Sequence, residues 1–147
     1  MKVTFIRHAQ SEYNIGQQFS NNVPITKDGA IACVSLDQTF DILILSPLKR
    51  AIQTYANSNI KTKRIIMSDL FQEKKDKPSN MMDNDTDYET TADFETRILK
   101  AIDFIKQLDC SNIGVIGHHD FIQKLTSKLI GKPISLSNLG NYVISIK

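Results

Sequence analysis

Three short apolar segments of this chain end in basic or hydroxyl side chains. The junctions are Lys2–Ile6 before Arg7 and His8, Asp41–Leu45 before Ser46 and nearby Arg50, and Ile113–Ile116 before Gly117, His118 and His119. Continuous apolar runs of this length are typical of parallel strands that helices cover on both faces. In such sheets, ligands bind beyond the carboxyl ends of the strands. We therefore expect the three polar clusters to share one edge of a sheet.

Helical segments alternate with the strands. We expect four helices. The first begins after Thr26, the second spans residues 48–57, the third is capped by Thr91 or Asp93, and the fourth spans residues 120–130 and ends before Gly131. In the second, Ser46 is expected to cap and Pro47 to take the first helical position. Apolar residues supply the core positions of the first and third helices: Ile31, Val34 and Leu36, then Phe94, Ile98, Leu99, Ile102, Ile105 and Leu108.

Two further strands and two loops complete the expected organisation. Arg64–Met67 and Tyr142–Ile146 are predicted strands, residues 17–24 a loop, and residues 69–91 one long surface loop. The alternation of strands and helices predicts an α/β fold, a three-layer sandwich with a mostly parallel central sheet flanked by helices. The length of 147 residues fits a single domain spanning residues 1–147.

The composition narrows the functional classes. Eighteen Lys and Arg against sixteen Asp and Glu give a net charge of +2, which does not predict binding to nucleic acid or a membrane surface. No apolar run approaches the roughly 20 residues of a membrane span, and Arg7 and His8 interrupt any signal-peptide core. We expect a cytoplasmic protein whose Cys33 and Cys110 are reduced, buried thiols.

The basic clusters fit chemistry on an anionic phosphoryl group. Neutral imidazole is a good nucleophile toward phosphorus, and arginines hold the phosphoryl oxygens. Arg50 lies in the first turn of its helix, where backbone N–H groups also favour anions. The sequence lacks HxH, HExxH and CxxC, so we predict neither a metal nor another cofactor. It also lacks the phosphate-binding and nucleophile motifs of nucleotide-binding proteins and serine hydrolases.

Four motifs resemble those of the histidine phosphatase superfamily, the phosphoglycerate-mutase-like proteins. Arg7-His8-Ala9-Gln10-Ser11-Glu12-Tyr13-Asn14 resembles the RHG-x-S-x-x-N opening, and Thr26-Lys27-Asp28-Gly29 resembles the LT-x-x-G element. Ser46-Pro47-Leu48-Lys49-Arg50-Ala51-Ile52-Gln53-Thr54 resembles SPL-x-RA-x-QT, and Val115-Ile116-Gly117-His118 resembles the strand of the second histidine. A late turn, Leu139-Gly140-Asn141, is also similar. The matches follow the family's order along nearly the whole chain, and Ala9 replaces the usual glycine.

The resemblance implies a role for each matching residue. His8 would be the nucleophile that forms a phosphohistidine intermediate, and His118 would take part in catalysis beside it. Arg7, Arg50 and His118 would bind the phosphoryl oxygens and stabilise the charge that builds up in transfer, and Asn14 would help to close the pocket. An acidic residue would protonate the leaving oxygen and then activate water.

Three carboxylates compete for the role of general acid. Glu73 matches best by position, although the usual glycine does not follow it. Glu12 and Asp120 are alternatives. A His-Asp pair carries the acid in the acid-phosphatase branch of the superfamily, and reading His119-Asp120 as that pair would shift the second histidine from His118 to His119.

Three functions follow as hypotheses. The short segment after Glu73 favours an open pocket and a phosphatase that hydrolyses a phosphorylated small molecule or phosphoprotein. Lys74, Lys75 and Lys77 could bind a second anionic group, although a solvated loop is the simpler interpretation. Phosphoglycerate mutase activity and a non-catalytic phosphate-binding domain are the alternatives. No sequence feature announces a protein partner or an oligomeric state.

Overall fold

The computed structural model describes residues 1–17 and 20–146. Residues 18 and 19, within the predicted loop 17–24, lie outside the described part. The described chain contains, in order, β1 (Lys2–Arg7), α1 (Lys27–Ala32), η1 (Cys33–Ser35), β2 (Thr39–Leu45), α2 (Lys49–Ala56), β3 (Lys61–Met67), η2 (Asp69–Phe71), η3 (Pro78–Asn80), α3 (Thr91–Lys106), β4 (Asn112–Gly117), α4 (His119–Ile130) and β5 (Asn141–Ser145). The η elements are single turns of 3-10 helix.

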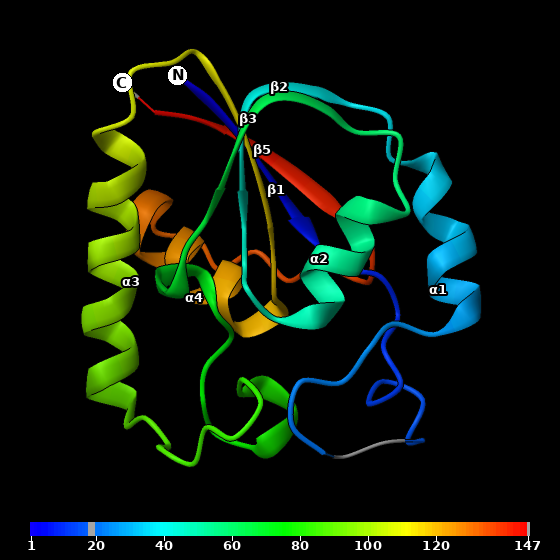
Figure 1. Ribbon diagram of the computed structural model, residues 1–147. Coiled ribbons are helices and arrows are strands. Elements are labelled where there is room, and N and C mark those ends of the chain that lie inside the picture. The colour runs from blue at the N-terminus through cyan, green and yellow to red at the C-terminus, as the bar shows by residue number, and fades with distance from the viewer. Residues whose placement is uncertain (18–19, 147) are drawn as a thin grey trace.

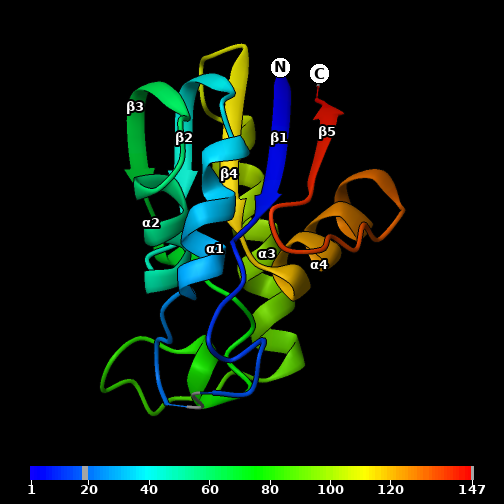
Figure 2. The same cartoon turned by 90° about the vertical axis from the view of Figure 1, so that its right-hand side faces the viewer.

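The five strands form one sheet in the order β3-β2-β4-β1-β5. The first four are parallel to one another, and β5 pairs antiparallel with β1 at the edge. Figure 1 shows the sheet nearly edge-on, with α3 and α4 on one side and α1 and α2 on the other. Figure 2, turned by 90°, shows α1 and α2 in front of the strands and α3 behind them. The expected α/β sandwich with a mostly parallel sheet is confirmed.

Side chains of successive strand residues enter two different cores, because they point to opposite faces of the sheet. On the α3 and α4 side, Val3, Phe5 and Val115 pack with the apolar face of α3 and with Phe121 of α4. On the other side, Ile6, Leu43, Leu45 and Ile116 pack with Phe40, Ala51 and neighbouring residues. Both faces of the central strands are buried, which explains why their sequences are apolar without alternation.

The helix boundaries correct several expectations. Thr26 caps α1 by accepting a hydrogen bond from the Gly29 N–H, as expected. The helix α2 begins at Lys49 with Leu48 as N-cap, so Pro47 is not its first residue and Ser46 is not its cap. Thr90, not Thr91 or Asp93, caps α3, and Asp93 completes a reciprocal capping box with it.

Three predicted core positions face solvent instead. Ile31, Val34 and Leu99 are exposed by 61%, 59% and 52%. A short helix that covers a sheet needs only one buried stripe, and in the first helical segment Cys33 and Leu36 supply it. Cys33 and Cys110 are free thiols, the first buried and the second partly buried.

The segment between β3 and α3 is not the surface loop that its composition predicts. Two 3-10 turns interrupt it, and it buries Phe71, Gln72, Glu73, Ser79, Asn80 and Met81. Some of its polar groups pair with α2, α3 and α4. Within the described residues, no helix is both long and apolar enough to span a membrane.

Candidate active site

The register of the parallel strands brings the polar clusters together. Arg7 at the end of β1 pairs with Gly117 of β4, and Leu45 at the end of β2 pairs with Ile116. His8, Ser46 and His118, which directly follow these three strands, therefore lie side by side at the carboxyl edge of the sheet. The chain after β3 leaves the sheet at the same end and returns toward this edge with Glu73.

A cavity of about 180 Å³ opens at this edge. Five of the residues expected from sequence line it: Arg7, His8, Asn14, Arg50 and Glu73. The remaining lining residues are Ser11, Tyr13, Lys77, Ser79, Asn80, His119 and Asp120. Among the described residues, no three His, Cys, Asp or Glu side chains cluster as a metal site would require.

Hydrogen bonds define the protonation of the His8 ring. Its Nδ1 lies 2.6 Å from the Ala9 carbonyl oxygen, which can only accept, so Nδ1 carries a proton. The Arg50 Nε–H donates to His8 Nε2 across 3.2 Å, so Nε2 is the unprotonated nitrogen. Burial first, and then the charges of Arg50 and Arg7, hold the pKa of His8 well below 6.5 despite the Ala9 carbonyl. The ring is therefore a neutral imidazole whose Nε2 lone pair faces a guanidinium.

Arg50 is held on all sides. Besides His8, its terminal nitrogens donate to the Ser79 carbonyl oxygen at 2.7 Å and to Asn80 Oδ1 at 2.8 Å. Asn80 in turn donates to Asp76 Oδ1. Burial lowers the Arg50 pKa to about 10, with Arg7 acting in the same direction and Glu73 against it, so the group stays cationic at neutral pH. The turn η3 thus fixes the guanidinium beside the histidine.

His118 lies behind His8, with the two ring centroids 5.2 Å apart. It is fully buried, and its Nε2 is 2.7 Å from Ser46 Oγ. Its other nitrogen, Nδ1, is also buried and has no hydrogen-bond partner within the described chain. Burial and the neighbouring Arg50 and His8 hold its pKa well below 6.5. His118 contacts the nucleophile candidate directly, although it does not line the cavity.

Arg7 and Asn14 approach from the first strand and the loop that follows it. Arg7 donates to the Leu136 carbonyl oxygen, while its buried Nε has no partner among the described atoms. Asn14 Oδ1 accepts from the Ser11 N–H at 3.0 Å, which folds the loop back over the cavity. Asn138 spans the loop and the strand end, because its Nδ2 donates to both Asn14 Oδ1 and the His8 carbonyl.

Ala9, the residue that departs from the family motif, fits without crowding the cavity. It is fully buried, and its N–H donates to Thr54 Oγ1 at 2.9 Å. Thr54 Oγ1 donates onward to the Arg50 carbonyl oxygen at 2.7 Å. The methyl group is not among the groups that line the cavity. The Ala9 backbone instead ties the histidine strand to the arginine helix.

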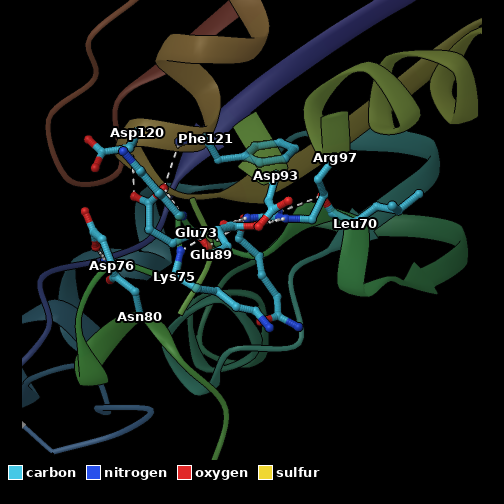
Figure 3. Close-up of polar contacts among 12 residues, drawn as sticks. Leu70, Glu73, Lys75, Asp76, Asn80, Glu89, Asp93, Arg97, Asp120 and Phe121 are labelled. Carbon is cyan, nitrogen blue, oxygen red and sulfur yellow. Dashed lines mark hydrogen bonds and ion pairs between the residues drawn. The ribbon is translucent and has the colours of Figure 1, made fainter. Parts of the chain in front are cut away.

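The Glu73 carboxylate sits at the N-terminus of α4 (Figure 3). Its Oε2 accepts from the Asp120 N–H at 2.9 Å, and its Oε1 from the Phe121 N–H at 2.8 Å and the Lys74 N–H at 2.9 Å. Burial raises the pKa of Glu73, and the charge of Asp120 adds to this. The backbone donors and Arg50 act against the shift without cancelling it. This carboxyl is thus buried, oriented by three backbone N–H groups and biased toward its protonated form.

The competing groups lie differently. Asp120 lines the cavity rim with a side chain 43% exposed, and its Oδ1 pairs with His119 Nδ1 at 2.9 Å. His119 also contacts Ser135 Oγ through Nε2, and it faces the rim rather than the His8 ring. Glu12 is not among the residues that line the cavity. The structure therefore brings His118, not His119, against His8, and Glu73 is the buried carboxyl of the cavity.

Sequence reasoning missed several groups of the site. Tyr13 was not singled out, and it lines the cavity beside Lys77, one of the three lysines considered for a second anionic group; the Lys77 ammonium is 5.0 Å from the centre of the Tyr13 ring. Ser79 and Asn80, which hold Arg50, lie in a segment without apolar pattern or motif. A hydroxyl or amide in such a segment carries no signal until its neighbours in space are known.

Comparison with known proteins finds similarity to one family. A model of the histidine phosphatase superfamily (branch 1) matches residues 3–74, the part that contains Arg7, His8, Asn14, Arg50 and Glu73. Through these residues, just under half of the chain, the sequence is similar to the histidine phosphatase superfamily. The comparison with curated proteins gave no match.

Solved structures of this superfamily's fold extend the likeness to the whole chain. An Escherichia coli protein assigned as an α-ribazole-5′-P phosphatase is 20% identical, with a TM-score of 0.82 over 100% of this chain and 91% of its own. The α-ribazole phosphatase of Shigella flexneri is 18% identical, with a TM-score of 0.76 over 100% and 91%. A phosphoserine phosphatase of Entamoeba histolytica is 17% identical, with a TM-score of 0.72 over 97% and 89%. At these identities the likeness establishes the phosphoglycerate-mutase-like fold.

Proposed function

We propose that this protein belongs to the histidine phosphatase superfamily and is a phosphomonoesterase that works through a phosphohistidine on His8. The observation that carries the proposal is the neutral His8 ring, whose unprotonated Nε2 faces the cationic Arg50 inside the cavity. A nucleophile must attack with a free lone pair, while the phosphoryl group needs positive charge nearby. This arrangement supplies both within 3.2 Å.

The surrounding groups suit the binding of a phosphoryl dianion. Arg7 and Arg50 supply positive charge at the cavity, and Arg7 Nε is a buried nitrogen that lacks a partner among the described groups. A buried polar atom without a partner costs free energy, which a phosphoryl oxygen would recover. Asn14 would close the cavity from the loop after β1.

Glu73 is proposed as the general acid and base. In the first step, His8 Nε2 forms a bond to phosphorus while the bond to the ester oxygen breaks and Glu73 gives that oxygen its proton. In the second step, the Glu73 carboxylate takes a proton from water as the water oxygen attacks phosphorus. The P–N bond then breaks and inorganic phosphate leaves. A carboxyl with a raised pKa suits the first step, whereas the Asp120 side chain is 43% exposed and pairs with His119 at the rim.

The small cavity favours a compact phosphomonoester, although the exposed rim at Asp120 leaves space for a phosphorylated side chain of a protein. The names of the similar structures, α-ribazole and phosphoserine phosphatases, support phosphomonoesters as the substrate class. Arg7 and Arg50 supply positive charge at the cavity, so the proposed chemistry needs no metal for that purpose. We therefore propose hydrolysis without a metal or other cofactor.

The test is hydrolysis of p-nitrophenyl phosphate by the purified protein in the presence of a chelator. We expect turnover in the wild type and a fall of at least about 100-fold in His8→Ala, because removal of the nucleophile leaves only the binding groups. Rapid acid-free quenching with labelled substrate should trap a phosphoenzyme in the wild type alone. Equal activity of both proteins would contradict the proposal.

Two controls separate the alternative functions. Interconversion of phosphoglycerates that depends on bisphosphoglycerate, without net ester hydrolysis, would indicate a mutase. Stabilisation by vanadate without any phosphoenzyme would indicate a phosphate-binding domain.

A further inference from the structure

The Arg97 guanidinium of α3 makes five hydrogen bonds to the segment that carries Glu73. Its NH1 donates to the Leu70 and Gln72 carbonyl oxygens at 3.0 and 2.7 Å, and its NH2 to the Glu73 carbonyl oxygen at 3.0 Å. Its Nε and NH2 also bind both carboxylate oxygens of Glu89, at 3.1 and 2.6 Å. A guanidinium has five N–H donors, so every donor of Arg97 is used. Figure 3 shows this convergence on the chain around Glu73.

Glu89 closes the clamp from the other side. Its Oε1 accepts from the Lys75 N–H at 2.9 Å, and its own N–H donates to the Lys75 carbonyl oxygen at 3.0 Å. The Arg97 and Glu89 side chains are only 14% and 11% exposed. Burial alone would raise the Glu89 pKa, but the hydrogen bonds from Arg97 and the Lys75 N–H lower it overall, which keeps the pair ionised. The backbone is therefore held on both sides of Glu73.

The clamp acts on a carboxyl that is itself anchored. The Glu73 side chain reaches the first turn of α4, while its backbone is bound to α3 through Arg97. The helices α3 and α4 pack against each other, so Glu73 is bound to two elements whose relative position is fixed. Neither Arg97 nor Glu89 lines the cavity. Neither would therefore contact a phosphoryl group bound there, and the hydrogen bond from Arg97 to the Glu73 backbone gives the pair a direct route to the acid.

We propose that the buried Arg97–Glu89 pair is a positioning device that aims the Glu73 carboxyl at the leaving oxygen. The inference rests on the proposed function, since it assumes that Glu73 is the acid. It goes further by assigning a catalytic contribution to two residues outside the cavity. A displacement of an acid by about 1 Å can cost about 100-fold in rate, so a clamp of this kind matters for chemistry and not only for folding.

The leaving group distinguishes positioning from simple structural support. A phenolate needs a proton as it leaves phenyl phosphate, whereas 2,4-dinitrophenolate leaves without one. The parameter kcat/KM covers only the steps up to departure of this group. Damage to the acid therefore lowers kcat/KM for the first ester and spares the second, whereas general damage to the cavity lowers both.

The experiment compares Arg97→Met with the wild type on these two esters. Methionine preserves the apolar stem and removes all five donors. We expect kcat/KM to fall by about 100-fold with phenyl phosphate and by less than about tenfold with 2,4-dinitrophenyl phosphate. Glu89→Gln and Arg97→Lys, which keep part of the clamp, should show the same order of effects with smaller losses. Lys100→Met, an exposed cation on the same helix, is the matched control and should leave both values unchanged.

The outcomes separate the two proposals. Stabilisation of each variant by vanadate verifies that the variant folds and retains the anion site. If Arg97→Met does not fold, Glu89→Gln and Arg97→Lys decide the result. Equal losses on both esters in an active enzyme would overturn the positioning role and leave the phosphatase intact. Absence of turnover in the wild type with either ester would overturn both.

Discussion

At the scale of single residues, burial shifts the pKa values of His8 and Glu73 in opposite directions. Both side chains are about 5% exposed or less, and burial disfavours the charged form of each. For His8 this lowers the pKa from 6.5, and for Glu73 it raises the pKa from 4.5. The imidazole therefore stays neutral while the carboxyl tends to keep its proton, which is the combination that the proposed first step requires.

This pair of shifts predicts the pH dependence of kcat/KM. The acid limb, set by protonation of His8, should lie below pH 6.5, and the alkaline limb, set by loss of the Glu73 proton, should lie above 4.5. The measurement is kcat/KM against pH with phenyl phosphate, after correction for ionisation of the ester. In Glu73→Gln the alkaline limb seen with phenyl phosphate should disappear, whereas with 2,4-dinitrophenyl phosphate the wild type itself should lack this limb. An acid limb above pH 6.5 would show that His8 is not the shifted group.

Motifs at strand ends made the arginines and histidines of this site predictable. Arg7, His8, Arg50 and His118 follow strands whose buried apolar character is visible in the sequence, so their shared edge could be expected. Ser46 differs from its expected role, because Leu48 is the N-cap of α2 while the Ser46 hydroxyl contacts His118 and accepts from the Leu48 N–H. In the sequence, a serine before a proline indicates a helix start whether or not the serine is the N-cap. Only the packing of β4 beside β2 shows that Ser46 is a partner of His118.

At the scale of elements, a glycine in β4 makes room for a ring of β2. A methyl group at Gly114 would lie 2.6 Å from two ring carbons of Phe40, which is itself 2% exposed. The space that the missing side chain leaves is thus filled by an aromatic group from the neighbouring strand.

Gly114→Ala should destabilise the protein by about 1–3 kcal/mol, because the buried ring must move and its packing is lost. Urea unfolding provides the measurement. Gly117→Ala in the same strand is the matched control, since its nearest contact outside the local chain would be Phe121 Cδ1 at an ordinary 3.9 Å. Equal losses of stability in both variants would show that the contact with Phe40 is not the cause.

The predictability of an element followed the strength of its local pattern. Strands and helix ends were placed within a few residues because buried runs and caps such as Thr26 are local signals. The segment after β3 had no such pattern, and its composition suggested a solvated loop. It is instead ordered by partners far away in sequence, such as Arg97 on α3 and Arg50 on α2. The long-range nature of these contacts is why the clamp and η3 were not predicted.

At the scale of the whole molecule, two buried neutral histidines couple stability to pH. In the folded protein, the pKa values of His8 and His118 both lie well below the 6.5 of an unfolded chain. Below pH 6.5 the unfolded chain therefore binds more protons than the folded one. Their contribution to stability is complete above pH 6.5 and is lost as the pH falls toward the folded-state values, at up to about 1.4 kcal/mol per pH unit for each histidine.

His118→Gln should flatten this pH dependence by about one proton. The measurement is the free energy of unfolding in urea at several pH values between about 7.5 and 5, where the slope reports the difference in bound protons. Comparison of variants removes the opposite effect of Glu73, whose raised pKa acts in both proteins. His119→Gln, at the partly exposed rim, is the control. An unchanged slope in His118→Gln would contradict the assignment.

The hydrogen bond between Arg50 Nε and His8 Nε2 has a consequence for the resting protein. While this hydrogen bond is present, the Nε2 lone pair that would attack phosphorus accepts the Arg50 Nε–H and is therefore less reactive toward other electrophiles. An incoming phosphoryl oxygen offers the guanidinium a negatively charged and therefore stronger acceptor than the ring. On the proposed mechanism, substrate binding therefore also frees the Nε2 lone pair for attack.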